Sequence, residues 1–239
     1  MKYENFPNDY IDKIKENPDC NYFTPVWDDV FQIVKPEVVV DIGCGNGVFS
    51  SYLVKKYNSM LVGVDGNEYA LKKARDNGFK QTYLVNDFSN DKLPLETSQY
   101  EFVVCKDVLE HLLDPMHLLA EIHRILKADG NLVVHVPNHF YLFGRLKFLL
   151  TNDIDTSKYF PSSKSWNFPH VRFFTYKAFV EMLSVAGFKV IKNLNYHFPN
   201  IPLMARLPKI FRTRSINCLT KKYPSQFCEG FVVLAQKSE

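Results

Sequence analysis

The run Val38-Val39-Val40-Asp41-Ile42-Gly43-Cys44-Gly45-Asn46-Gly47 decides the fold of this chain. A β-branched strand carries an acid near its end, and glycine then occupies every second position. Glycine is needed where a backbone turns sharply and where a ligand approaches it with no Cβ atom in the way. We expect a helix to begin at Val48, with its first amides and positive dipole end facing polar or anionic ligand groups. The run therefore predicts a small-molecule site at the mouth of an α/β sheet.

Length and composition are those of one globular domain. The 239 residues can bury a full core, and 46% hydrophobic with 23% charged residues is an ordinary balance. The first twenty residues lack an apolar run, and no stretch reaches the ~20 apolar residues of a membrane span. The five scattered cysteines show no CxxC spacing, which favours a reducing compartment without disulfides or zinc. We expect a cytoplasmic protein with no metal site and no stable membrane insertion.

The charge is unevenly distributed. A net charge of +3 is too small to indicate a nucleic-acid partner by itself. Between Met182 and Cys228, however, the chain has no Asp or Glu and contains several basic residues, among them Arg206. This acid-free segment is either a solvated surface or a surface that meets an anionic small-molecule acceptor.

Strand and helix patterns alternate along most of the chain. Continuous apolar strands between amphipathic helices predict a parallel sheet that is covered on both faces. The expected strands are 38–42, 60–65, 81–85, 100–105, 132–136, 188–194 and 231–235. The expected helices are 24–34, 48–57, 68–76, 114–127, 142–150 and 175–186. Two irregular stretches, 138–170 and 195–230, follow strands, where α/β folds keep their binding loops.

The glycine spacing narrows the kind of site. A third glycine of a G-x-G-x-x-G dinucleotide fingerprint would fall on Val48 or Ser50, and the G-K-[ST] of a P-loop is absent. Acids instead follow successive strands: Asp65 after the second, Asp87 after the third and Asp107 after the fourth. A carboxylate such as Asp65 can accept two hydrogen bonds from ribose hydroxyls.

The glycine loop and the strand-end acids resemble motifs of the class I S-adenosylmethionine-dependent methyltransferases. The same resemblance includes the run Val108-Leu109-Glu110-His111-Leu112-Leu113-Asp114-Pro115. The resemblance covers residues 38–138 and is strongest to a small bacterial branch of type 11 and type 23. Residues 170–175, His-Val-Arg-Phe-Phe-Thr, are similar to members associated with surface-polysaccharide biosynthesis. Tyr100-Glu101 stands where the family usually has Phe-Asp.

The resemblance implies a Rossmann-like, seven-stranded, mostly parallel sheet with helices on both faces, a final antiparallel strand and a lid from inserted loops. It implies one methyltransferase domain over residues 1–239. Residues 1–37 would be an N-terminal helical segment and residues 38–137 the cofactor-binding core, while the insertions 138–170 and 195–230 would cover the substrate.

The resemblance also implies a cofactor, S-adenosylmethionine, and the residues that hold it. The glycines would line its methionine part, Asp41 would fix the loop, and Asp65 would hold the ribose diol. Asp87 would accept from the adenine amino group, beside the backbone of Phe88. Any one of these residues by itself could equally be a glycine required by a turn or an acid at the end of a strand. The full set is Asp41, Gly43, Cys44, Gly45, Gly47, Asp65, Gly66, Asp87, Phe88, Cys105 and Lys106.

Methyl transfer to a hydroxyl needs a general base, whereas a neutral amine needs only its lone pair. Histidine is the natural base near neutral pH. His117 and His123 lie on an expected helix surface, and His135 lies inside a strand and fits a core histidine. The candidate catalytic residues are therefore His111, His139 and His170, each of which has a structural role as its alternative. The candidate substrate-binding residues are Asn138, Tyr141, Arg172 and Arg206.

The expected function is an S-adenosylmethionine-dependent O- or N-methyltransferase. Its acceptor would be a hydroxyl or amine of a nucleotide-linked or phosphorylated sugar in surface-glycan or capsule biosynthesis. One alternative acceptor is a quinone or other lipid-like ring, since residues 140–149 could form an apolar lid. A second alternative is a non-catalytic, cofactor-binding regulatory subunit. The glycine spacing disfavours an NAD-dependent dehydrogenase. The sequence leaves open whether the chain is a monomer or a homodimer.

Overall fold

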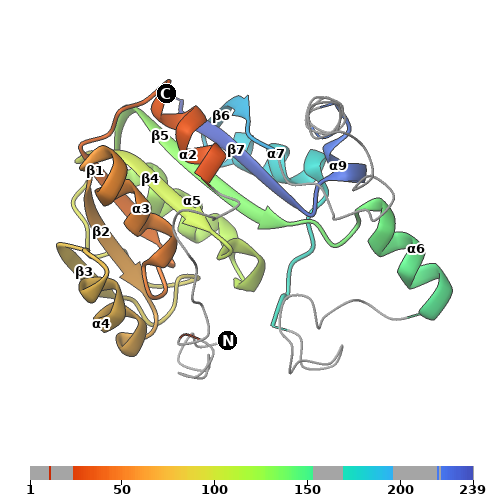
Figure 1. Cartoon of the computed structure of the whole chain (residues 1–239), viewed down its shortest axis with the longest axis horizontal. Coiled ribbons are helices and arrows are strands. Elements are labelled where there is room, and N and C mark those ends of the chain that lie inside the picture. Colours follow the sequence, from red (N-terminus) through yellow and green to blue (C-terminus); the bar gives the residue numbers. More distant parts are fainter. Residues whose placement is uncertain (1–10, 12–23, 153–168, 196–219, 221, 239) are drawn as a thin grey trace.

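The computed structural model describes residues 11, 24–152, 169–195, 220 and 222–238. Its elements lie in the order that the sequence predicts (Figure 1). They are α2 (Thr24–Phe31), β1 (Val38–Ile42), α3 (Val48–Tyr57), β2 (Met60–Asp65), α4 (Glu68–Asp76), β3 (Gln81–Leu84), β4 (Tyr100–Lys106), the 3-10 helix η3 (Leu109–His111), α5 (Pro115–Ile125), β5 (Leu126–Pro137), α6 (Leu142–Thr151), α7 (Tyr176–Val185), β6 (Phe188–Asn193), α9 (Pro224–Phe227) and β7 (Gly230–Lys237).

The strands form one seven-stranded sheet in the order β3-β2-β1-β4-β5-β7-β6. Strands β1 to β5 pair in parallel, and β7 runs antiparallel to both of its neighbours, β5 and β6. This is the Rossmann-like sheet with a final antiparallel strand that the family resemblance implies. The chain direction changes from β1 toward β2 on one side and toward β4 on the other. Ligands of open α/β sheets bind at the strand ends beside such a switch point.

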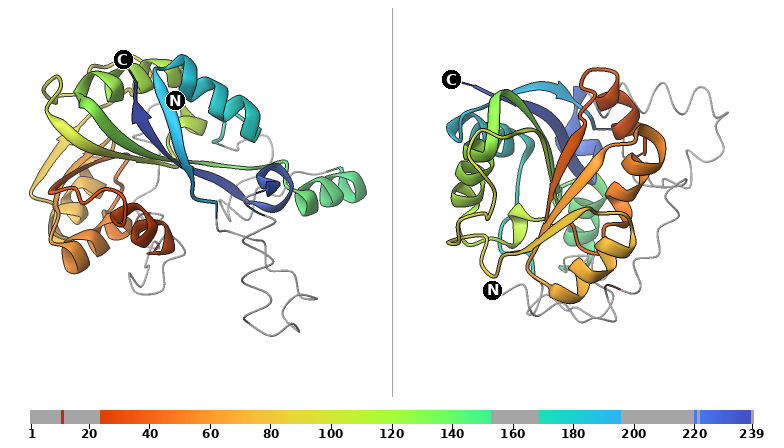
Figure 2. Two further views of the ribbon diagram at one scale, coloured as in Figure 1. Left: turned by 90° about the horizontal axis from the view of Figure 1, so that it is seen from above. Right: turned by 90° about the vertical axis from the view of Figure 1, so that its left-hand side faces the viewer.

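Two apolar layers cover the sheet, because alternate residues of each strand point to opposite faces. In β1, Val39 packs with α2, α3 and α4 on one face, whereas Val40 and Ile42 pack with α5 and α7 on the other. The view of Figure 2 shows helices on both faces of the twisted sheet. The parallel core is thus buried on both sides, which explains its continuous apolar strands.

Capping residues set the helix starts. Asp114 accepts hydrogen bonds from the amides of Met116 and His117 at the start of α5, with Pro115 in the first position. Thr175 caps α7 through the amide of Ala178, and Asn67 caps α4 through the amide of Ala70. These are preferred N-cap side chains, and each satisfies an amide that the helix leaves unpaired.

Two expected boundaries and one expected irregular stretch are wrong. Strand β5 begins at Leu126, not at residue 132, because Leu126 pairs with Tyr100 across a bulge and α5 stops at Ile125. Helix α2 ends at Phe31, short of Val34. The stretch 195–230 contains the short helix α9, which Pro224 opens at its first turn. For β5, pairing with the distant residue Tyr100 overrides the helical pattern of the local sequence.

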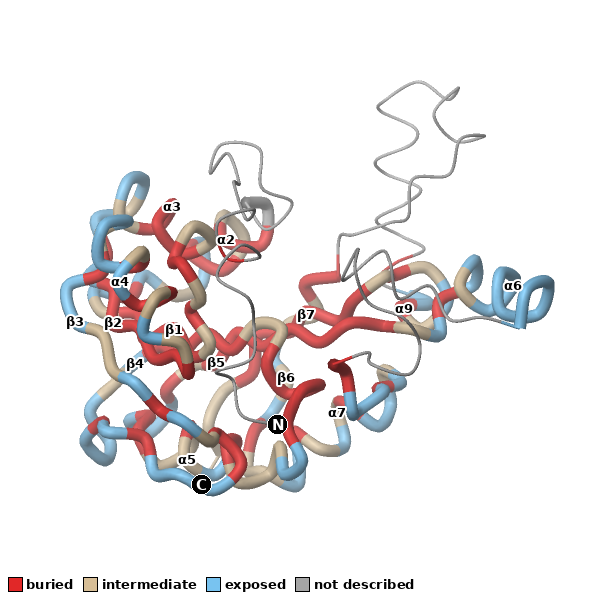
Figure 3. Tube along the Cα trace, turned by 90° about the horizontal axis from the view of Figure 1, so that it is seen from below, coloured by how far each residue is buried: buried red, intermediate tan, exposed pale blue. Residues whose placement is uncertain are grey.

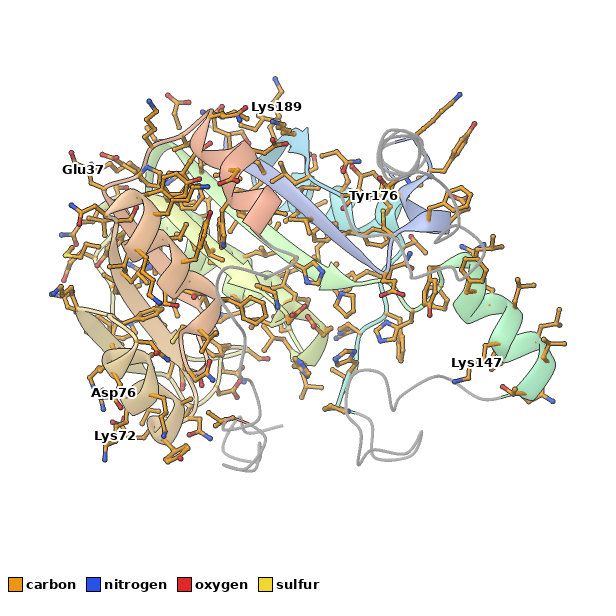
Figure 4. All side chains as sticks on the ribbon, viewed as in Figure 1. Glu37, Lys72, Asp76, Lys147, Tyr176 and Lys189 are labelled. Carbon is orange, nitrogen blue, oxygen red and sulfur yellow. The ribbon has the colours of Figure 1, made fainter. Side chains whose placement is uncertain are left out.

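Helix α6 projects away from the sheet, beyond the ends of β5 and β7 (Figures 1 and 3). None of its residues is buried, and Leu149 and Leu150 are 76% and 83% exposed. Lys147 lies on this helix, far from β1 and α3 (Figure 4). None of the helices that the structure describes combines the length and the apolar content that crossing a bilayer requires. The expected lid over the substrate includes residues 153–168 and 196–219, which lie outside the described residues.

Asn138 joins the end of β5 to the turn before β7. Its buried side-chain amide donates to the carbonyls of Cys228 (2.7 Å) and Ser225 (3.2 Å), and its Oδ1 accepts from the amide of Phe140 (2.9 Å). We predict that Asn138→Ala lowers the free energy of unfolding by about 2–4 kcal/mol, because it leaves buried backbone groups unpaired. Urea denaturation measures this, with Asn86→Ala, an exposed asparagine, as the control. An equal, small effect of both substitutions would contradict the prediction.

Candidate active site

The polar residues expected to carry function lie at one edge of the sheet. Strands β1 to β5 are parallel, so their carboxyl ends, and the loops that follow them, meet at that edge. The glycine loop 43–47 follows β1, Asp65 ends β2, and Lys106 ends β4. Because β1 lies between β2 and β4, these groups occupy neighbouring positions.

The three loop glycines have different roles. All three have a positive φ, which glycine adopts without strain. A Cβ on Gly43 would lie 2.3 Å from Val108 Cγ2, and one on Gly47 would lie 2.5 Å from Phe79 Cε2, so packing requires glycine at both positions. A Cβ on Gly45 would meet nothing within 4 Å. Gly45 therefore offers the open backbone that a cofactor can approach.

Asp65 fastens this loop to the next strand. Its buried carboxylate accepts hydrogen bonds from the amides of Gly45 (2.8 Å) and Asn67 (2.9 Å). Burial raises the pKa of Asp65 to about 6, against these hydrogen bonds. A carboxylate has about four lone-pair positions, so it can still accept from a ribose hydroxyl. The residues present thus fit the expected cofactor.

Asp41 connects the glycine loop region to α3 through a hydrogen bond. Its carboxylate accepts a hydrogen bond of 2.6 Å from the hydroxyl of Ser50 in the first turn of α3. Burial raises the pKa of Asp41 to about 7, which the Ser50 hydrogen bond and the charge of Lys106 oppose. Asp41 therefore connects the end of β1 to the first turn of α3.

The other expected cofactor residues are divided between surface and core. Asp87 is half-buried beyond β3 and accepts from the amide of Ser89 and the side-chain amide of Asn90, both at 2.8 Å. Cys44, Gly66, Phe88 and Cys105 are buried. The Lys106 ammonium lies 3.8 Å from the centre of the Phe49 ring and pairs with Asp107.

The structure brings the three candidate catalytic histidines together. His111 comes from η3, His139 follows β5, and His170 comes from the segment before α7. His139 Nε2 lies 2.9 Å from His170 Nδ1, and the His111 and His170 ring centres are 4.7 Å apart. We call these residues the histidine cluster. Its members are 31 and 28 residues apart in sequence, so only the fold assembles it.

Burial keeps the histidine cluster neutral. It lowers the pKa of His139 to about 4 and that of His170 to about 2, in each case helped by the charge of neighbouring histidines. The pKa of His111 is lowered by burial too, although Asp107 and the Pro169 carbonyl oppose the shift. At neutral pH each ring therefore keeps a nitrogen lone pair.

Two acids lie beside the histidine cluster: the sequence analysis placed Asp107 at the sheet edge, but it assigned a site role neither to Asp107 nor to Glu110. Glu110 is buried in η3, and burial together with the charge of Asp107 raises its pKa well above the usual range. For Asp107, burial alone would raise the pKa, but Lys106 and His135 hold it well below its usual range. The apolar neighbours Leu109 and Leu112 were the available signal, because an acid within such a run is expected to be buried.

The expected substrate-binding residues are more dispersed. Asn138 uses its side chain within the fold, and Tyr141 is buried at the start of α6. The Arg172 guanidinium is directed to the carbonyls of Leu112 and Leu113, so it holds residues 169–175 against η3. Arg206 lies outside the described residues. His135 is buried and hydrogen-bonded to Asp107, in keeping with a core histidine.

Comparison with known proteins supports a specific family. Residues 40–134 match the family model for a methyltransferase domain. Ubiquinone biosynthesis O-methyltransferase of Actinobacillus pleuropneumoniae is 29% identical over 107 residues, which cover 42% of this chain and 45% of that protein. The corresponding protein of Coxiella burnetii is 28% identical over 107 residues. The chain thus matches less than half of the length of these curated relatives.

Solved structures agree over nearly the whole chain. The complex of the Haloferax volcanii Trm112 methyltransferase activator with a methyltransferase has a TM-score of 0.64 at 20% identity, covering 97% of this chain and 96% of that one. An S-adenosylmethionine-dependent methyltransferase of Thermotoga maritima has a TM-score of 0.62 at 22% identity, covering 99% and 98%. The expected fold class and the family resemblance are confirmed.

The open position of Gly45 yields a first prediction for this site. Gly45→Leu should reduce the affinity for S-adenosylhomocysteine at least tenfold, because its side chain would occupy the space of the ligand. Its free energy of unfolding should fall only by the cost of a strained φ, about 1–2 kcal/mol. Gly43→Ala is the matched comparison: its Cβ would meet Val108, so it should destabilise the fold more. Calorimetry giving wild-type affinity for Gly45→Leu would refute the assignment.

Asp65 yields a prediction on pH. A carboxyl with a pKa of about 6 in the ligand-free protein takes up a proton as the pH falls below 6, and the protonated form loses an acceptor. The affinity for S-adenosylhomocysteine should therefore fall below pH 6, by up to about tenfold per pH unit. Asp65→Asn should bind weakly with a flatter profile; Asp41, which also titrates, is unchanged in both proteins. Parallel profiles in calorimetry would contradict this role of Asp65.

Proposed function

We propose that this chain, which carries a class I, S-adenosylmethionine-dependent methyltransferase domain over residues 40–134, transfers a methyl group to a hydroxyl oxygen of a small acceptor. The histidine cluster is the observation that carries this proposal. It lies beyond β4 and β5, next along the sheet edge from the glycine loop of β1. An amine acceptor would leave three convergent, neutral imidazoles without a catalytic use.

The division of chemical work follows from the residues. S-adenosylmethionine supplies a methyl group that its sulfonium already activates. The chain must hold the acceptor in line with that methyl group, exclude water and remove the hydroxyl proton. The glycine loop and Asp65 would hold the cofactor, and the histidine cluster would remove the hydroxyl proton of the acceptor.

His139 is the member of the cluster that we assign as general base. Its ring is half-buried, whereas His111 and His170 are buried, but its Nδ1 is itself buried and its Nε2 faces His170 Nδ1. An acceptor hydroxyl would therefore replace His170 as the donor to His139 Nε2. Its contact with His170 Nδ1 fixes the orientation of the ring. His170 would therefore orient His139, as a third group orients the general base in catalytic triads.

The side chains around His139 favour an acceptor with an aromatic ring. Phe173 lies edge-on to His139 at 4.8 Å between ring centres, and Phe140 lies 6.3 Å from Phe173. Both phenylalanines are at least 40% exposed, so they can stack with a planar ring. A phenolic hydroxyl, with a pKa near ~10, also gives up its proton to a buried imidazole more easily than an alkyl hydroxyl does. The relatives named for ubiquinone biosynthesis support the same acceptor class.

A sugar hydroxyl is the second candidate acceptor. It is supported by the resemblance of residues 170–175 to methyltransferases associated with surface-polysaccharide biosynthesis. An anionic, nucleotide-linked or phosphorylated sugar would also suit the basic, acid-free segment 182–228. Carbohydrate rings present apolar faces that Phe140 and Phe173 could cover, so an acceptor panel must decide between the two classes.

Transfer of a labelled methyl group from S-adenosylmethionine tests the function, with hydroxylated aromatic rings and nucleotide sugars as acceptors. His139→Ala should lower kcat by about 10²-fold or more, with the cofactor affinity within twofold of wild type. His123→Ala, on α5 and hydrogen-bonded to the Ser238 carbonyl, is the control. Less than a fivefold loss in His111→Ala, His139→Ala and His170→Ala alike would indicate an amine acceptor. Cofactor binding without turnover on any acceptor would favour a regulatory subunit.

A further inference from the structure

Glu110 is a fully buried acid in η3. Its exposed fraction is 0%, and neither carboxylate oxygen has a hydrogen-bond partner in the described part of the chain. Burial without a hydrogen-bond partner disfavours the ionised form of a carboxyl group, and a positive charge bound beside it offsets that cost. Such a group is retained where something of opposite charge binds beside it.

Two imidazoles lie around this carboxylate. One potential ligand atom from each of Glu110, His111 and His170 lies within 4.8 Å of the other two, and all three residues are buried. The backbone builds this juxtaposition: the amides of Val171 and Arg172 donate to the Glu110 carbonyl at 2.9 and 3.0 Å. The segment that carries His170 is therefore held against η3 by its main chain.

The hydrogen bonds of the two histidines suit ligation. His111 Nδ1 lies 3.2 Å from the Pro169 carbonyl, and a carbonyl only accepts, so Nδ1 carries the ring proton. His111 Nε2 is then the lone-pair nitrogen, and it lies 3.9 Å from Glu110 Oε1. His170 is oriented by His139. Metal-binding histidines commonly donate their second nitrogen to a backbone carbonyl in this way.

We propose that Glu110, His111 and His170 bind one divalent transition-metal cation. One carboxylate and two imidazoles are ligands typical of Zn²⁺, Fe²⁺ and Mn²⁺, whereas Mg²⁺ and Ca²⁺ prefer oxygen ligands alone. Two ligands bound at ~2.1 Å from one zinc ion are at most ~4.2 Å apart, so small side-chain rotations must draw the three ligand atoms closer. The sequence analysis expected no metal because it considered the cysteines; this site uses none of them.

The position of the cation gives it a place in the reaction, and this part rests on the proposed function. The site adjoins His139, the assigned base, and leaves coordination positions for an acceptor oxygen. A cation bound to a hydroxyl lowers its pKa, so the proton passes more easily to a weakly basic imidazole. Glu110, His111 and His170 would then hold the metal. Because His170 bound through Nε2 donates its Nδ1 proton to His139 Nε2, the acceptor hydroxyl would replace His170 as the donor to that nitrogen before His139 accepts its proton.

Calorimetric titration of the chelator-treated full chain with ZnCl₂ tests the binding. We expect one Zn²⁺ per chain and at least a tenfold weaker affinity in both Glu110→Gln and His170→Gln. Glu110→Gln preserves side-chain size and removes a buried ionisable group, so it should fold at least as well as the wild type. His117→Gln, on α5 and directed to the Asp91 carbonyl, is the histidine control and should bind as wild type does. Absence of saturable binding, or wild-type affinity in Glu110→Gln, would overturn the proposal.

Cobalt replacement identifies the ligands. Co²⁺ bound to nitrogen and oxygen gives only weak visible absorption bands, whereas a cysteine ligand adds intense thiolate-to-metal absorption. We expect the weak bands alone, and thiolate absorption would overturn the site. Failure of the proposed function is separable, because it would leave zinc binding and its loss in Glu110→Gln intact while no acceptor is methylated.

Discussion

The parallel pairing of β1 with both β2 and β4 is the constraint on which the site depends. It places the carboxyl ends of three neighbouring strands at one edge, where β1 contributes the glycine loop and β2 contributes Asp65. The hydrogen bond from the Gly45 amide to the Asp65 carboxylate then fixes the loop relative to the second strand. Both apolar layers of the sheet stabilise this edge, because each strand is packed on its two faces.

Buried carboxyl groups are the main titratable groups at this edge. Asp41, Asp65 and Glu110 are buried, and burial raises the pKa of each, so all three carboxylates are held in surroundings that disfavour their ionised form. Lys106 lies among them but pairs with Asp107. An arrangement of this kind favours cationic ligands. A sulfonium cofactor satisfies this requirement on the glycine-loop side, and a divalent cation would satisfy it beside Glu110.

Much of this structure follows from local sequence pattern. The strands from Val38 and Met60, the helix from Val48 and the caps Asp114 and Thr175 lie where periodicity and capping chemistry predict them. Long-range contacts explain what the sequence did not predict. Strand β5 starts early because of its pairing with Tyr100, and Asn138 serves the fold because Cys228 and Ser225 lie beside it. His170 meets His111 only because the amides of residues 171 and 172 bind the Glu110 carbonyl, which no pattern in the sequence indicates.

The central claim is that the glycine loop presents a methyl donor to the histidine cluster across the ends of β1, β4 and β5. A crystal structure of the chain with S-adenosylhomocysteine tests this claim most directly. The account predicts the ribose hydroxyls on Asp65, the methionine part against Gly45, and the sulfur facing His139. Binding of the ligand elsewhere, or a sulfur that points away from His111, His139 and His170, would contradict it.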